Sequence, residues 1–126
     1  FWRTLGMRIK RLDPDTHDRL LASVSHLPHA LAALLISMQD PEALELAGKG
    51  FLDTTRIASG DGGLWRDIFL DNRDNLHATL SDMRDRIDRL IDLIDPARAD
   101  ELRAWLDDAA QRRDEMNRKQ DAGAGE

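Results

Sequence analysis

Hydrophobic residues recur at helical spacing along most of this chain, and Asp-Pro pairs divide the pattern into segments. An aspartate before a proline places a capping carboxylate ahead of a residue suited to the first helical turn. These pairs lie at 13–14, 40–41 and 95–96. They predict helices over 14–38 and 41–48 and a final helix from Pro96, and we expect a shorter helical piece over 52–58. The pattern therefore predicts an all-α fold, a helical bundle without a sheet.

The longest helical pattern runs from Leu64 to about Ile94, after a turn at Ser59-Gly60-Asp61-Gly62-Gly63. Its apolar positions are spaced alternately by four and three residues, as in a coiled-coil seam. Opposite charges four residues apart occupy the other face. Such a helix needs a partner along its length, so we expect it to form the core of a homodimer. The seam comprises Leu76, Leu80, Met83, Ile87, Leu90 and Ile94.

The two ends of the chain differ from this helical middle. The sequence starts at Phe1 without an initiator methionine, and alternation at 7–10 suggests a short extended segment. We interpret residues 1–12 as a linker from a preceding domain, so that the chain is a fragment of a longer protein. We expect one helical domain over 13–116 and a flexible polar tail over 117–126.

Composition narrows the class of protein. The 126 residues are 41% hydrophobic and 33% charged, as in ordinary globular proteins, and contain no cysteine for disulfides or thiolate metal sites. We expect no apolar run to approach the roughly 20 residues of a membrane span, and we expect a cytoplasmic protein with no membrane partner. A net charge of -6 argues against nucleic-acid binding. An anionic ligand would need a local cluster of cations.

The segment Ser25-His26-Leu27-Pro28-His29 places a proline and two imidazoles within an apolar helical run. Proline inside a helix costs about 3 kcal/mol unless something compensates. His26 and His29 lie three residues apart, on one face of the helix. Three interpretations remain: a metal site, which lacks an evident third ligand; core histidines beside a kink; and a polar ligand site. The last is favoured, because Pro28 leaves the Val24 carbonyl without its normal donor.

Three other groups of residues are candidates for chemistry. Asp53 and Arg56 form either a helix-surface ion pair or, through the arginine, a grip on a ligand carboxylate, and the spacing favours neither. The turn at 59–63 matches no dinucleotide or phosphate loop, so Trp65 after it either caps the core or reaches a neighbouring subunit. For His17, near a helix start, a structural role is favoured.

Four motifs in order resemble the C-terminal helical domain of prephenate dehydrogenases, which are NAD(P)-dependent enzymes of tyrosine biosynthesis. The resemblance covers about residues 1–95, and its opening part is similar to the end of the family's nucleotide-binding domain. The motifs are His17-Asp18, Ser25-His26-Leu27-Pro28-His29, Gly50-Phe51-Leu52-Asp53-Thr54-Thr55-Arg56-Ile57-Ala58 and Trp65-Arg66-Asp67-Ile68.

The resemblance implies roles for individual residues. Arg56 would contact a substrate carboxylate, His29 would line the substrate pocket, and His26 is a weaker candidate for the same role. Asp53, Trp65 and Ser25 would shape or gate the pocket.

The family's reaction is oxidative decarboxylation of prephenate to 4-hydroxyphenylpyruvate, and its NAD or NADP site and catalytic histidine belong to the N-terminal domain. The resemblance therefore implies no catalytic, cofactor-binding or metal-binding residue here, and an inactive fragment. Two alternatives stay open: an arogenate dehydrogenase domain, and a non-catalytic helical module for dimerisation or ligand sensing.

Overall fold

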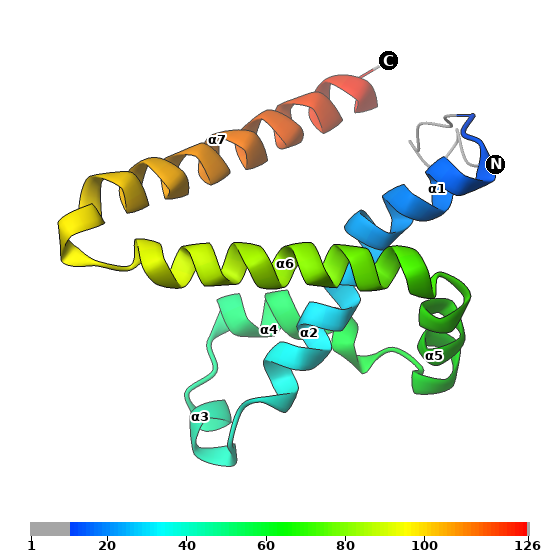
Figure 1. Cartoon of the computed structure of the whole chain (residues 1–126), viewed down its shortest axis with the longest axis horizontal. Coiled ribbons are helices and arrows are strands. Elements are labelled where there is room, and N and C mark those ends of the chain that lie inside the picture. The colour runs from blue at the N-terminus through cyan, green and yellow to red at the C-terminus, as the bar shows by residue number, and fades with distance from the viewer. Residues whose placement is uncertain (1–10, 126) are drawn as a thin grey trace. The chain divides into compact units, whose positions relative to one another are not determined.

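The computed structural model describes residues 11–125, and every regular element in that range is a helix. This confirms the all-α prediction, while the extended segment expected at 7–10 lies outside the described residues. The helices are α1 (Pro14–Leu21), α2 (Leu27–Ser37), α3 (Pro41–Glu45), α4 (Lys49–Thr55), α5 (Gly62–Asp71), α6 (Arg73–Leu93) and α7 (Ala99–Ala124), as Figure 1 labels them.

The chain divides into two compact units, Leu12–Met83 and the part from Arg84 onward. The first unit has a small core on the π-helical segment Ala22–His26, on α2 and on the start of α6. Its buried apolar side chains are Ala22, Leu27, Ala30, Ala32 and Leu76. In the second unit α6 ends, a 3-10 turn spans Pro96–Arg98, and α7 follows.

The Asp-Pro pairs start helical segments as predicted. The carboxylate of Asp13 accepts hydrogen bonds from the backbone N–H of Thr16 at 2.9 Å and from its hydroxyl at 2.7 Å. These bonds lower the pKa of Asp13, because they favour its charged form. Asp40 likewise accepts from the N–H of Ala43 at 2.8 Å. Asp95 accepts from the N–H of Ala97 at 2.7 Å, although the segment there begins as the 3-10 turn.

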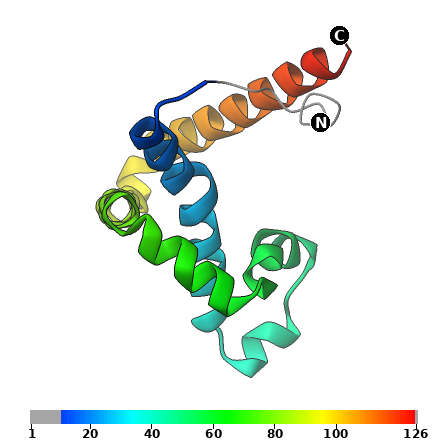
Figure 2. The ribbon, with the colours of Figure 1, turned by 90° about the vertical axis from the view of Figure 1, so that its right-hand side faces the viewer.

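The predicted helix over 14–38 is helical from Pro14 to Ser37, but a π-helical segment, Ala22–His26, separates α1 from α2. The N–H of Leu27 bonds to the carbonyl of Ala22, five residues back. Pro28 has no N–H and its ring crowds the carbonyl four residues earlier, so the wider π turn relieves that clash. Figures 1 and 2 show α1 and α2 as one coil.

The prediction of one helix over 64–94 is wrong, because α5 ends and α6 begins around Asn72. Asn72 has φ −112° and ψ 31°, outside the α-helical region. Its side chain bonds to the backbone of α1, a contact that the hydrophobic spacing does not encode. Figure 2, which looks along α6, shows α5 leaving it at a sharp corner. The helix also starts earlier than predicted, at Gly62, where Asp61 caps the N–H of Leu64 at 2.8 Å.

The C-terminal helix is longer than predicted. α7 continues to Ala124, so residues 117–124 are helical rather than an irregular tail. This stretch contains Arg, Lys, Gln and Ala, which lose little side-chain freedom in a helix and so favour its continuation.

The expectation that no apolar run approaches the length of a membrane span also needs correction. One helical stretch among the described residues, Pro14–Ser37, is long and apolar enough to cross a membrane by length and composition alone. The same stretch supplies four of the five buried apolar residues of the first unit. A core helix passes the same length test, and burial of one face gives this stretch a role in packing.

Candidate functional site

The two histidines of the Ser-His-Leu-Pro-His motif pack against aromatic rings of α5. His29 stacks on Trp65 with ring centroids 3.7 Å apart and an interplanar angle of 13°. Phe69, one turn further along α5, meets both rings edge-on, at 6.0 Å from His29 and 5.9 Å from Trp65. His26 lies 6.4 Å from Trp65, also edge-on. We call His26, His29, Trp65 and Phe69 the histidine–aromatic cluster.

The turn before α5 closes over the stacked pair. A Cβ added to Gly60 would lie 2.8 Å from Nε1 of Trp65 and 3.2 Å from Cε1 of His29. Both distances are too short for ordinary contacts, so glycine lets the backbone approach the rings. Neither Gly60 nor Phe69 was predicted as a site residue. The signals available in the sequence were the glycine-rich turn and the four-residue spacing of Phe69 from Trp65.

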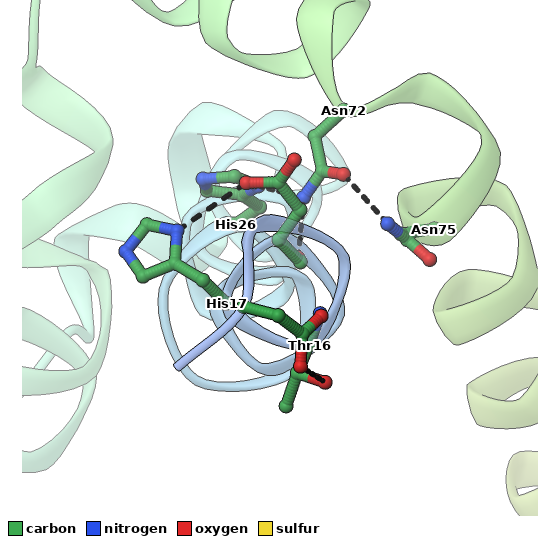
Figure 3. Close-up of polar contacts among 7 residues, drawn as sticks. Thr16, His17, His26, Asn72 and Asn75 are labelled. Atoms are coloured by element: carbon green, nitrogen blue, oxygen red, sulfur yellow. Dashed lines mark hydrogen bonds and ion pairs between the residues drawn. The ribbon is translucent and has the colours of Figure 1, made fainter. Parts of the chain in front are cut away.

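His26 belongs to a polar network that joins three helices (Figure 3). The amide nitrogen of Asn72 lies 3.2 Å from Nδ1 of His26 and 2.7 Å from the backbone oxygen of Asp18. Asn75 donates to the side-chain oxygen of Asn72 at 2.9 Å. Burial lowers the pKa of His26, and the nearby Asp18 carboxylate opposes that shift. His26 is therefore more readily neutral than a histidine in water.

His29 carries an unsatisfied polar atom. Its side chain is only 6% exposed, and Nδ1 is buried without a hydrogen-bond partner among the described residues. Leaving a buried polar group unpaired costs about 1–3 kcal/mol. His29 is therefore not a core histidine whose polar atoms are all satisfied.

Arg56 is not paired with Asp53. The carboxylate of Asp53 bonds instead to Nζ of Lys49 at 2.7 Å. Within residues 11–125 the guanidinium of Arg56 has no ion pair or hydrogen bond, and its side chain is exposed. The structure therefore excludes the ion-pair alternative for these two residues. Arg56 is free to bind a carboxylate.

Arg56 and Asp53 line an open hollow of about 530 Å³ on α2, α4 and the 3-10 turn Arg56–Ser59. The other lining residues are Ile36, Leu52, Thr55, Ala58 and Ser59. Neither histidine lines this hollow, so the structure does not bring Arg56 and His29 into one cavity. The turn Arg56–Ser59 connects them along the chain, since the next residue, Gly60, contacts the stacked rings.

The remaining candidates have simpler surroundings. Ser25 is half-buried in the π-helical segment. His17 is exposed, and its Nδ1 lies 3.3 Å from the Asp18 carboxylate, a local contact. The described residues hold no group of three His, Asp or Glu side chains able to share a metal ion.

Fold and site together define an all-α domain that holds two buried histidines against part-buried aromatic rings and has a separate hollow lined by an arginine. The sequence model of the family described as "Prephenate dehydrogenase, dimerization domain" matches residues 13–108. The chain belongs to this family.

Relatives and solved structures agree with this assignment. The prephenate dehydrogenase of Bacillus subtilis is 30% identical over 86% of this chain, and the cyclohexadienyl dehydrogenase of Zymomonas mobilis is 35% identical over 57%. A prephenate dehydrogenase from A. aeolicus, solved in complex with hydroxyphenyl propionate and NAD+, is 36% identical with a TM-score of 0.77 over 91% of this chain. Synechocystis arogenate dehydrogenase is 33% identical, with a TM-score of 0.78 over 90%.

The chain spans only part of each relative. It covers 31% of the B. subtilis protein, 27% of the Z. mobilis protein, 42% of the A. aeolicus chain and 44% of the Synechocystis chain.

Proposed function

We propose that this chain is the C-terminal portion of an NAD(P)-dependent prephenate dehydrogenase of tyrosine biosynthesis. The whole enzyme would convert prephenate to 4-hydroxyphenylpyruvate by oxidative decarboxylation. The observation that carries this proposal is the match of the family's dimerization domain over residues 13–108. The relatives named prephenate dehydrogenase and cyclohexadienyl dehydrogenase support it.

Arg56 is the proposed substrate anchor. Its unpaired guanidinium lines the hollow, and guanidinium binds a carboxylate through two parallel hydrogen bonds. Prephenate has two carboxylates, which suits a cationic group within an acidic chain. The A. aeolicus relative was solved with hydroxyphenyl propionate, whose ring and carboxylate together resemble the proposed product.

The histidine–aromatic cluster is the proposed wall for the rest of the substrate. His29 would line this wall beside Trp65, and His26 would contribute as a second polar group. Trp65, Asp53 and Ser25 would shape or gate the pocket. Since Arg56 and His29 do not share one hollow here, we propose that the pocket is completed by a part of the enzyme outside this chain.

The cofactor belongs to that other part of the enzyme. When bound, NAD or NADP supplies the acceptor for the hydride that leaves the substrate ring. This sequence contains no G-x-G-x-x-G motif, so its residues do not fit a dinucleotide site. We assign neither the cofactor nor the proton-abstracting base to a residue of this chain, and we expect the chain alone to be inactive.

We also propose that the chain forms a homodimer through α6 and the part that follows it. Leu76, at the start of the seam, is 4% exposed, and Leu80, Met83 and Leu90 are half-buried, whereas Ile87 and Ile94 are 46% and 65% exposed. Apolar residues at heptad spacing that no described residue covers suit a second copy of the same helix.

The full-length protein tests the proposal directly. The coding sequence ahead of Phe1 should encode a glycine-rich βαβ unit, and the purified protein should reduce NAD or NADP with prephenate and release carbon dioxide. The 126-residue chain alone should do neither. A full-length protein that binds prephenate without turnover, and has no upstream nucleotide-binding unit, would favour the non-catalytic module instead.

An arogenate dehydrogenase is the second candidate, because the Synechocystis arogenate dehydrogenase matches about as well as the A. aeolicus enzyme, with TM-scores of 0.78 and 0.77. The two substrates differ by a keto group against an amino group. Measuring kcat/KM for prephenate and arogenate on one preparation separates the two candidates.

A further inference from the structure

Asn72 lies at the corner between α5 and α6, and the sequence patterns assign it no role. We propose that Asn72 is a positioning residue that holds His26 as a neutral hydrogen-bond donor toward the substrate, with the ring proton on Nε2. This inference rests on the proposed function, in which His26 faces the substrate. Its structural basis is the set of hydrogen bonds around the Asn72 amide.

The orientation of the Asn72 amide follows from its two neighbours. The backbone oxygen of Asp18 can only accept a hydrogen bond, so the amide atom 2.7 Å from it must be the nitrogen. On the other side, the nitrogen of Asn75 donates to the Asn72 oxygen at 2.9 Å. Rotating the amide would place two oxygens against each other at 2.7 Å. Figure 3 shows Asn72 with His26 on one side and Asn75 on the other.

This orientation determines the tautomer of His26. The nitrogen of Asn72 carries two hydrogens; one bonds to Asp18, and the other is available to Nδ1 of His26 at 3.2 Å. To accept it, Nδ1 must present a lone pair, so the proton of the neutral ring is on Nε2. A doubly protonated ring would place the N–H at Nδ1 of His26 against the N–H of the Asn72 amide, and two donors repel each other. The contact therefore disfavours both the imidazolium and the other tautomer.

The Nε2 side of the ring remains available for a ligand. His26 is 8% exposed, and the described residues offer no hydrogen-bond partner to Nε2. Nδ1 of His29 is fully buried and has no hydrogen-bond partner among the described residues, but Nε2 of His26 is not in this state. Since Nε2 of His26 also lacks a described partner, it keeps access to solvent. A fixed N–H at this position can donate to a carboxylate or hydroxyl oxygen of the substrate without first reorienting.

The tautomer is measured in the unsubstituted full-length protein. Nitrogen-15 correlation spectra of its histidines at about pH 8, where an ordinary imidazole is neutral, identify the protonated nitrogen of each ring. The signal that disappears in His26→Gln belongs to His26 and should show the Nε2–H pattern. An Nδ1–H pattern for this ring would overturn the proposal. Because this measurement needs no turnover, it separates failure of the inference from failure of the proposed function.

Kinetics of the full-length enzyme test the role toward substrate. Asn72→Ala should raise KM about threefold to tenfold and change kcat less than about twofold, because binding is lost in the ground and transition states alike. Its His26 spectrum should show mixed tautomers. The matched control, Asn117→Ala on the exposed part of α7, should change neither.

A double-mutant comparison distinguishes positioning from general packing. In His26→Gln, the glutamine amide supplies an N–H near the Nε2 position without needing Asn72. Adding Asn72→Ala to this variant should therefore raise KM by less than about twofold. An equal rise in KM with and without His26, or a raised KM with the His26 tautomer unchanged, would show a purely structural Asn72 and would overturn the proposal.

Discussion

The two units of the chain differ in how far they bury their side chains. Leu12–Met83 contains every buried residue of the described part, including both histidines of the cluster. From Arg84 to Gly125 no residue is buried, although Trp105 and Ile91 are large and apolar, at 49% and 62% exposed. The first unit can therefore hold a site by its own contacts. The described residues of the second unit form no buried core, and in the proposed enzyme a second copy would cover them.

Introducing a charge on the uncovered seam should have the largest effect. Ile87→Asp in the full-length protein should weaken dimerisation by about 2–4 kcal/mol, because the carboxylate would be buried against the partner helix without a counterion. Sedimentation velocity over a range of concentrations measures the change. Glu42→Ala, at an exposed position of α3 in the other unit, is the control. A dimer of unchanged affinity in Ile87→Asp would show that this seam is not the interface.

Substituting Arg56 tests the proposed substrate site in the first unit, as Ile87→Asp tests the proposed dimer interface in the second. Arg56→Ala in the full-length enzyme should lower kcat/KM roughly 30-fold to 150-fold. This corresponds to a loss of about 2–3 kcal/mol of binding free energy in the transition state, because a charge-assisted pair with a substrate carboxylate is removed. The dimer should persist, since Arg56 lies in the other unit. Steady-state kinetics with Arg112→Ala as the matched arginine control measures the difference. Unchanged kinetics would remove Arg56 from the substrate site.

Gly60 tests how tightly the histidine–aromatic cluster is packed. Gly60→Ala would bring a methyl group to 2.8 Å from Nε1 of Trp65, so the His29–Trp65 stack must shift. We expect a loss of about 1–3 kcal/mol in stability, typical of overpacking. Gly62→Ala is the matched control, because a Cβ at Gly62 meets nothing within 4 Å. Thermal unfolding followed by tryptophan fluorescence compares the two, and equal melting temperatures would contradict this account of Gly60.

The sequence predicted the features that depend on local chemistry. The Asp-Pro pairs gave the correct starts for α1 and α3, and Pro28 predicted a disturbed helix where the π-helical segment lies. Features that depend on distant contacts were missed. The corner at Asn72 requires its bond to Asp18, 54 residues away, and periodicity across the corner is unbroken. The position of Gly60 on the stacked rings likewise depends on where Trp65 and His29 meet.

The same distinction applies to the candidate site residues. His26 and His29 were chosen from one motif and Trp65 from another, and the structure brings the three side chains together in the cluster. Arg56 and Asp53 were expected beside them but line a separate hollow. Their motif fixes which residues lie on one helical turn, and it contains no information about the neighbouring surface that would complete a pocket.

The smallest predicted effect concerns pH and the buried histidine. Burial lowers the folded-state pKa of His26 below its ordinary value, so the unfolded chain binds more protons than the folded one between those two pKa values. Stability contributed by neutral His26 is complete above pH 6.5, the ordinary value, and falls as the pH decreases toward the folded-state pKa. Urea unfolding at pH 8 and pH 5.5 should show this loss, and His26→Gln should reduce it. An identical pH dependence in His26→Gln and the unsubstituted protein would show that burial of His26 is not linked to folding.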